Sequence, residues 1–215
     1  MAELIRGLDA AVVRANLERV REEIAGTGRD PAGVEVLAAV KYVALEELGV
    51  LAEAGVAVAG ENRAQDLEAK ARAHPELTWD FIGHLQSRKV KQVLPLVRFV
   101  HSVASDSVLR QLERHATPAT EVLVEVNVAE EEGKSGVLPG DLDDVIARCA
   151  ARVVGLMTMP PLAADPEDSR RWFVALAELA GERGLRHLSM GTSQDYLVAV
   201  QEGATIVRLG TTLYG

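Results

Sequence analysis

The stretch Val34–Lys41, with the sequence VEVLAAVK, is a short apolar run that ends on a lysine. It is the first of eight such runs along the chain, and a helical pattern follows each of the first seven. Near-continuous apolar strands separated by helices are typical of parallel strands that are buried on both faces. The predicted strands span residues 34–41, 56–60, 78–83, 98–102, 121–127, 153–159, 187–191 and 205–210.

Eight strand-and-helix units predict an α/β fold, a single closed (β/α)8 barrel of the TIM type that spans residues 1–215. No linker rich in Pro, Ser or Gly divides the chain. An open, doubly wound sheet is the alternative. It usually has a glycine-rich turn after the first strand, where this chain has Lys41-Tyr42-Val43.

An extra helix is predicted over residues 3–26, because Val13, Leu17, Val20 and Ile24 share one helical face. We expect the N-terminal segment 1–28 to pack on the barrel. The chain ends directly after the eighth predicted strand. The N-terminal helix is therefore expected to cover the side where the last helix of such a barrel usually lies.

Composition excludes several classes of function. The net charge is −9, which disfavours a nucleic-acid-binding protein. No apolar run is long enough to span a membrane.

The single cysteine, Cys149, has no disulfide partner and favours a cytoplasmic location. The histidines show no metal-ligand spacing, so no metal is expected. A low aromatic content of 4% favours a monomer.

Lys41 stands where active sites of such barrels lie, at the carboxyl end of a strand. Strand alternation puts it on the same face as Leu37 and the small Ala39, which leaves room at the barrel mouth. Apolar surroundings disfavour the ammonium form of an amine, and a neutral amine can form an imine with an aldehyde. A solvated lysine at a strand end is the alternative interpretation of this feature alone.

Hydroxyl-bearing residues and glycines follow the seventh and eighth predicted strands, where barrels of this kind usually bind phosphate. Ser193 is expected to open the helix 194–201, and free amides there favour an anion. Gly210 permits close approach of the backbone, and Thr211 adds an amide and a hydroxyl. Arg208 shares the face of Gly210. Ordinary turn residues are the alternative interpretation of this pattern alone. In a closed barrel the eighth strand neighbours the first, so a phosphate here would lie beside Lys41.

Short pieces along the whole chain give it a resemblance to the pyridoxal phosphate homeostasis proteins, the YggS or PROSC family. Their joint order is specific, although no single piece is. The pieces are Ala39-Val40-Lys41, Gly60-Glu61-Asn62, Phe81–Gln86, His101-Ser102-Val103, Val126-Asn127, Lys134-Ser135-Gly136, Gly155-Leu156-Met157, Leu188–Gly191 and Arg208–Thr211.

The resemblance implies a barrel similar to the N-terminal domain of alanine racemase, with pyridoxal phosphate as cofactor. It implies that Lys41 forms the imine and that Arg208 faces the pyridine nitrogen, which makes the cofactor a weaker electron sink. By the same resemblance Ser193, Gly210 and Thr211 bind the phosphate. Further residues expected at the cofactor pocket are Asn62 and, as possible lining, His84, Met157 and Ser189.

Three functions are compatible with these residues. The first is a non-enzymatic carrier that sequesters pyridoxal phosphate and supplies it to apo-enzymes in vitamin B6 homeostasis. The second is an amino-acid racemase. Racemisation needs a base on each face of the substrate, and only Lys41 is a supported candidate, so no complete catalytic pair is identified. The third is a barrel enzyme that forms a substrate imine with a sugar phosphate.

Overall fold

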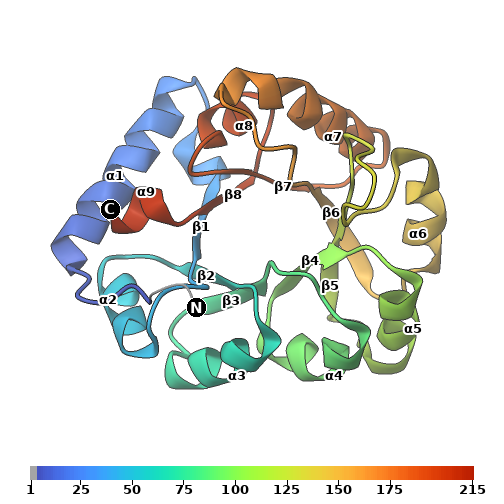
Figure 1. Cartoon of the computed structure of the whole chain (residues 1–215), viewed down its shortest axis with the longest axis horizontal. Coiled ribbons are helices and arrows are strands. Elements are labelled where there is room, and N and C mark those ends of the chain that lie inside the picture. The colour runs from blue at the N-terminus through green and yellow to red at the C-terminus, as the bar shows by residue number, and fades with distance from the viewer. Residues whose placement is uncertain (1–3) are drawn as a thin grey trace.

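Eight parallel strands close into a barrel in chain order in the computed structural model, which describes residues 4–215 (Figure 1). The closing pair is β1 (Glu35–Ala39) with β8 (Ile206–Leu209), in which Leu37 lies opposite Arg208 and Ala38 opposite Leu209. The predicted closed barrel is therefore confirmed over the open sheet.

The other strands lie inside or close to their predicted ranges. They are β2 Val58–Glu61, β3 Thr78–Phe81, β4 Phe99–Val103, β5 Glu121–Glu125, β6 Arg152–Met157 and β7 His187–Thr192.

Helices cover the outside of the barrel between the strands. None of them, within residues 4–215, is long and apolar enough to cross a membrane. The α-helices are α1 Ala10–Gly26, α2 Leu48–Glu53, α3 Ala64–Ala73, α4 Val90–Val93, α5 Asp106–His115, α6 Leu142–Arg148, α7 Arg170–Glu182, α8 Tyr196–Gln201 and α9 Thr211–Tyr214. Short 3-10 turns are η1 Pro31–Gly33, η2 Leu45–Glu47, η3 Ser87–Lys89, η4 Leu94–Leu96, η5 Pro139–Asp141 and η6 Pro166–Ser169.

The predicted start of the N-terminal helix is wrong, because α1 begins at Ala10; residue 3 lies outside the described part of the chain. The Asp9 carboxylate accepts a hydrogen bond from the Ala11 amide at 2.7 Å and caps the helix. Before the cap the chain is extended. Ile5 pairs with Val43, and the Ile5 amide donates to the Tyr42 carbonyl at 2.7 Å. The segment before α1 thus lies against the loop that follows β1.

The C-terminus also differs from the prediction, since the short helix α9 follows β8. Helix α1 packs beside α9, between α2 and α8, and so covers the expected side of the barrel (Figure 1). The Asn16 side chain donates to the carbonyls of Leu213 and Gly215, at 3.2 and 3.0 Å. Helices α1 and α9 thus cover this side of the barrel together.

Strand alternation divides the apolar core into two layers. The larger layer lies between the strands and the helices and includes Ala38, Val40, Val207 and Leu209. The smaller layer fills the barrel interior and consists of Leu37, Val58, Phe99, Leu123, Val154, Met157 and Ile206, with Ile82 packed against it. Polar side chains are buried among these interior residues, and they lead toward the mouth of the barrel.

Candidate functional site

The carboxyl ends of β1, β7 and β8 meet at one side of the barrel mouth. The β1–β8 pairing ends at Ala38 and Leu209, and beyond it the Tyr214 hydroxyl donates to the Ala39 carbonyl at 3.2 Å. A Cβ added to Gly210 would lie 3.9 Å from the same carbonyl, so the backbone of Gly210 is close to Ala39. The predicted neighbourhood of the end of β8 and the Lys41 loop is therefore present.

Ser193 and the start of α9 form a small polar cluster at this place. The Ser193 hydroxyl accepts hydrogen bonds from the Gly210 amide at 3.2 Å and from the Thr212 amide at 3.4 Å. Thr211 begins α9 and is exposed. A hydroxyl and backbone amides on one edge of the mouth are donors that suit an anionic oxygen.

The predicted helix start at Ser193 is wrong, because α8 begins at Tyr196 after the cap residue Asp195. The Asp195 carboxylate accepts hydrogen bonds from the amide and the hydroxyl of Thr192, at 2.8 and 3.1 Å. The loop before the helix is therefore closed by an Asp-centred turn. The donors around Ser193 come from the residues after β8 and not from α8.

Gly191 sets the course of the loop that contains Ser193. Its φ is +89°, and an added Cβ would lie 2.6 Å from the Ala199 Cβ and 2.9 Å from the Tyr196 Cα. Residues other than glycine rarely adopt this backbone conformation. A glycine is therefore required where β7 turns toward the mouth and α8 packs against it.

Arg208 points into the barrel interior and is buried, with 6% of its surface exposed. Nη1 donates to the carbonyl and the hydroxyl of Ser189, at 2.7 and 2.6 Å, and Nη2 donates to the Thr158 carbonyl at 2.9 Å. Burial lowers the pKa of Arg208 to about 10, opposed by the charges of Asp195 and Glu125. Among residues 4–215 no carboxylate forms an ion pair with it. The site therefore holds a protonated guanidinium with neutral partners.

Lys41 is half-buried and lies in a turn that follows β1. Its Nζ lies 4.5 Å from the centre of the Tyr42 ring, an ordinary cation–π distance. The carbonyl of Val40, the residue before Lys41, accepts a hydrogen bond from buried Lys70 at 2.7 Å. Lys70 also donates to Glu61 Oε2 at 2.6 Å, so the backbone before Lys41 is held from outside the barrel. The Lys41 amine is thus presented from an anchored loop.

The other predicted residues are spread over different depths. Asn62 is half-buried after β2, and its amide donates to Glu61 Oε1 at 2.6 Å. His84 is exposed after β3. Met157 packs in the apolar interior layer, and Ser189 is fully buried beneath Arg208. The structure brings Ser193 and Gly210 together and places Ser189 under Arg208, while His84 forms no hydrogen bond with either group among residues 4–215.

Glu125 is a buried carboxyl at the mouth that sequence reasoning did not include among the site residues. It ends β5, and Ser135 donates a hydrogen bond to its Oε2 at 3.0 Å. Burial raises its pKa, and the Ser135 hydrogen bond and the charges of His84 and Arg208 oppose this effect. Its inward position follows from alternation with Leu123, which is the signal that could have identified it.

Asp80 and His101 are two more interior residues that sequence reasoning did not place in the site. Both are fully buried, and His101 Nε2 lies 3.1 Å from Asp80 Oδ2. Each is a polar residue at an inward position of its strand. Among residues 4–215 no group of three or more acidic, histidine or cysteine side chains is arranged to hold a metal ion.

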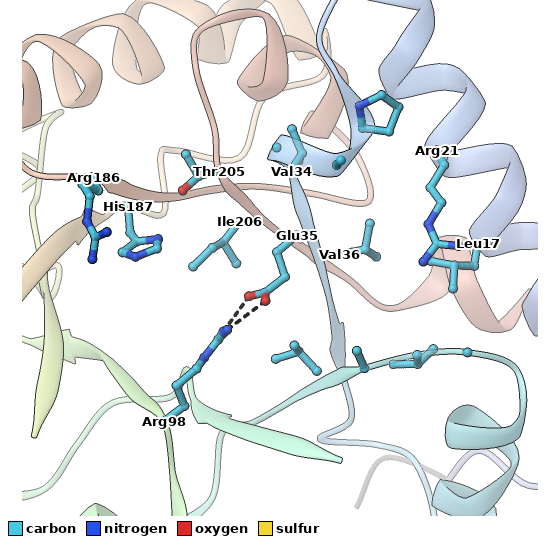
Figure 2. A pocket seen from close by; sticks show the side chains of 17 residues that line it. Leu17, Arg21, Val34, Glu35, Val36, Arg98, Arg186, His187, Thr205 and Ile206 are labelled. Carbon is cyan, nitrogen blue, oxygen red and sulfur yellow. Dashed lines mark hydrogen bonds and ion pairs between the residues drawn. The ribbon is translucent and has the colours of Figure 1, made fainter. Parts of the chain in front are cut away.

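A cavity of about 660 Å³ opens at the opposite end of the barrel, where the strands begin (Figure 2). Figure 2 shows Glu35 and Arg98 facing each other across it, and the two side chains form a bidentate pair at 2.8 and 2.5 Å. Because strand ends and strand starts lie at opposite ends of the barrel, this cavity is separate from the loop of Lys41.

Comparison with known proteins gives one consistent family. Residues 8–215 match the family model described as alanine racemase, N-terminal domain. The chain is 39% identical over 214 residues to a pyridoxal phosphate homeostasis protein of Aquifex aeolicus, covering 93% of this chain and 94% of that protein. It is 36% identical over 208 residues to the protein of the same name from Pseudomonas aeruginosa, covering 92% and 90%.

Solved structures agree with this assignment. PipY of Synechococcus elongatus PCC7942, a structure with PLP bound, superposes with a TM-score of 0.79 at 28% identity, covering 94% of this chain and 100% of PipY. A protein of unknown function from Bifidobacterium adolescentis superposes with a TM-score of 0.85 at 30% identity, covering 99% and 98%. Alanine racemase from Corynebacterium glutamicum, at 16% identity and a TM-score of 0.73, shares the fold; the match covers 97% of this chain and 61% of the racemase.

Proposed function

The chain belongs to the family of pyridoxal phosphate homeostasis proteins, and we propose that it binds pyridoxal phosphate as an imine on Lys41 and supplies this cofactor in vitamin B6 homeostasis. The observation that carries the proposal is the pairing of β1 with β8, which makes the ends of these two strands neighbours. The loop of Lys41 follows β1, the cluster of Ser193 with the Gly210 and Thr212 amides follows β7 and β8, and the buried guanidinium of Arg208 lies on β8.

The cluster around Ser193 fits a phosphate group. A phosphate monoester is an acceptor of several hydrogen bonds, and backbone amides with a hydroxyl supply donors without adding side-chain charge. The close backbone of Gly210 adds no side chain to the approach. We assign the phosphate to Ser193, Gly210 and Thr211. We assign Asn62 to the cofactor pocket, on the β2 side of the mouth.

Arg208 fits the ring nitrogen of the cofactor. Its Nη groups already donate to Ser189 and to Thr158, whereas Nε–H has no hydrogen-bond partner among residues 4–215. Nε also keeps contact with solvent, because it is not among the fully buried side-chain nitrogens and oxygens that lack a hydrogen bond in that part of the chain. A guanidinium donates a hydrogen bond without giving up its proton, which suits an unprotonated pyridine nitrogen and a weak electron sink.

Lys41 is the lysine best suited to hold the aldehyde. The chain has five lysines, and of the other four Lys70 is paired with Glu61, Lys134 with Glu131, and Lys89 and Lys91 lie on the outside near α4. A primary amine and an aldehyde condense to a C=N bond with release of water, and this is the chemistry that the cofactor offers at Lys41.

A carrier agrees better with these residues than a racemase does. Racemisation needs a second base opposite Lys41. Tyr42 lies on the same turn as Lys41, and His84 is exposed on another loop. The homeostasis name of the relatives also supports a role in cofactor supply. We assign this role to the cytoplasm, with apo-enzymes that use pyridoxal phosphate as recipients; a monomeric state stays a prediction.

Two measurements test the proposed function. Titration with pyridoxal phosphate is expected to produce the visible band of an imine in the wild type and in Lys91→Ala, and not in Lys41→Ala. The loaded protein is then incubated with L-alanine or L-serine, and chiral chromatography is expected to find no D-enantiomer above the level given by Lys41→Ala. Formation of D-enantiomer that depends on Lys41 would show that the protein is a racemase.

A further inference from the structure

A row of hydrogen-bonded side chains leads from Arg208 into the closed interior of the barrel. Ser189 Oγ lies 2.6 Å from Arg208 Nη1 and 2.9 Å from His101 Nδ1, and His101 Nε2 lies 3.1 Å from Asp80 Oδ2. Asp80 in turn accepts hydrogen bonds from Arg98 at 3.1 and 2.6 Å. These residues come from β3, β4, β7 and β8 and from the residue before β4, so the row crosses the barrel.

The protonation states of the row follow from its surroundings. Burial alone would raise the pKa of Asp80, but His101 and Arg98 lower it overall, so Asp80 is ionised. Burial lowers the pKa of His101 more than Asp80 raises it, and the charges of Arg208 and Arg98 lower it further. His101 is therefore neutral and has a single ring proton.

The direction of every hydrogen bond is then determined. The Asp80 carboxylate can only accept, so the ring proton of His101 lies on Nε2. His101 Nδ1 must accept, so the Ser189 hydroxyl donates to it. The Ser189 oxygen then accepts from Arg208 Nη1. This is the one arrangement of protons in which both ring nitrogens of neutral His101 are satisfied.

This row has the residue types of a Ser-His-Asp triad but not its accessibility. Ser189, His101 and Asp80 are all fully buried. The hydroxyl of Ser189 is held between His101 and the guanidinium of Arg208, and a nucleophile needs an open approach for its substrate. The row therefore acts on Arg208 rather than on a substrate.

We propose that Asp80, His101 and Ser189 are positioning residues that lock Arg208 from below, so that its Nε–H faces the ring nitrogen of the cofactor. Arg208 has neutral acceptors at both Nη groups because His101 and Ser189 separate it from the Asp80 charge. A carboxylate in direct contact would compete with the ring nitrogen for the guanidinium. The inference rests on the proposed function, because it assigns the cofactor ring to this side of the mouth.

Ser189→Ala tests the proposal, since it deletes one oxygen from the row and leaves the Ser189 carbonyl in place. The matched control is Ser102→Ala, another buried serine of the barrel, whose hydroxyl donates to the Gly83 carbonyl outside the row. Both variants and the wild type are loaded with pyridoxal phosphate. The position of the visible band is recorded between about pH 6 and 9, the range in which a ring nitrogen without a fixed donor could titrate.

In the wild type and in Ser102→Ala we expect a band position that does not change with pH. In Ser189→Ala we expect a shifted band whose position depends on pH, and roughly tenfold weaker binding of pyridoxal phosphate. All three proteins should still be reduced by borohydride at Lys41. A wild-type band in Ser189→Ala, with reducible Lys41, would overturn the positioning role and leave the proposed function intact. A wild type without a reducible imine would overturn both.

A second measurement needs no cofactor. Nitrogen NMR of the apoprotein, labelled at histidine, is expected to show His101 mainly as the neutral Nε2–H tautomer at about pH 6.5, where a free histidine is half protonated. Ser189→Ala should shift the Nδ1 resonance of His101, and Ser102→Ala should not. A His101 that is mainly protonated at this pH, or the Nδ1–H tautomer, would contradict the assigned direction of the row.

Discussion

Ser193 shows how a single residue joins two elements of the site. Its hydroxyl accepts hydrogen bonds from the amides of Gly210 and Thr212. The loop after β7 is therefore fixed to the start of α9. Ser193 and Gly210 are also assigned to the phosphate, together with Thr211. Any contribution of Ser193 to binding should therefore depend on the phosphate and not on the aldehyde.

We predict that Ser193→Ala weakens binding of pyridoxal phosphate by roughly tenfold, which corresponds to about 1.4 kcal/mol and the loss of a hydrogen bond to a charged group. Binding of pyridoxal, which lacks the phosphate, should stay within about twofold of the wild type. Absorbance titrations with the two aldehydes measure both values, and Ser107→Ala on α5 is the control. Equal weakening for the two ligands would remove Ser193 from the phosphate site.

Sequence reasoning could predict the residues that stand at strand ends. Lys41, Ser193, Arg208 and Gly210 follow from strand order and from alternation, because the carboxyl ends of barrel strands meet at one mouth. Asp80 and His101 could not be assigned a partner, because the sequence does not show which inward residues of β3, β4 and β7 lie at the same level along the barrel axis. That depth is set by strand stagger, including the register shift between β7 and β8 at Ser189 and Thr192.

At the scale of elements, α3 holds the loop that presents Lys41. Lys70 on this helix is buried, pairs with fully buried Glu61 on β2 and donates to the Val40 carbonyl. Glu61 also accepts the amides of Asn62 and Arg63, at 2.6 and 2.9 Å. One ion pair thus fixes the turns after β1 and β2 against the outside of the barrel.

Lys70→Met is predicted to lower the free energy of unfolding by about 3–5 kcal/mol, because Glu61 would remain as a buried charge without its partner. Adding Glu61→Gln should recover part of this loss. The control is Arg72→Met on the same helix, whose pair with Glu68 is exposed and should contribute at most about 0.5 kcal/mol. Chemical denaturation measures all four proteins, and similar losses for Lys70→Met and Arg72→Met would refute this role of the pair.

Element types were predictable to a large extent, whereas element boundaries were not. All eight strands were identified from apolar runs. The start of α1 was predicted too early. The spacing of apolar residues identifies the helix, but it does not show that the residues before the helix are extended. Asp9 was the local signal for the true start. Similarly, Asp195 rather than Ser193 marks the start of α8.

For the whole molecule, closure of the barrel creates a polar path inside an apolar interior. Asp80, His101 and Arg208 lie on separate strands and meet because β8 returns to β1. Charged groups face His101 from several elements: Asp80 on β3, Arg98 before β4, Arg208 on β8 and, at a greater distance, His187 on β7. The net effect of this interior on folding should depend on pH.

We predict that stability falls as the pH is lowered below about 6.5, the ordinary value for histidine. The pKa of His101 is lowered in the folded state, so its contribution is complete above that pH and is lost as the pH falls through the folded pKa. The slope from one such group is at most about 1.4 kcal/mol per pH unit. Glu125, whose pKa is raised by burial, contributes with the opposite sign, and its contribution is lost as the pH rises from about 4.5.

His101→Gln should remove this share of the slope in denaturation experiments at several pH values between about 5 and 7.5. His187→Gln should remove a separate share, because burial also lowers the pKa of His187. The control is Gln111→Ala on α5, a side chain that does not titrate, and it should leave the slope unchanged. A slope that persists in full after His101→Gln would mean that the buried row does not govern the acid sensitivity of the fold.

Peptide mapping tests whether Lys41 is the residue that holds pyridoxal phosphate. The protein is loaded with pyridoxal phosphate, reduced with borohydride, digested and analysed by mass spectrometry across its five lysines. We expect one modified residue, Lys41, and loss of the modification in Lys41→Ala. Modification at Lys134 or another lysine in place of Lys41, or at no lysine, would contradict it.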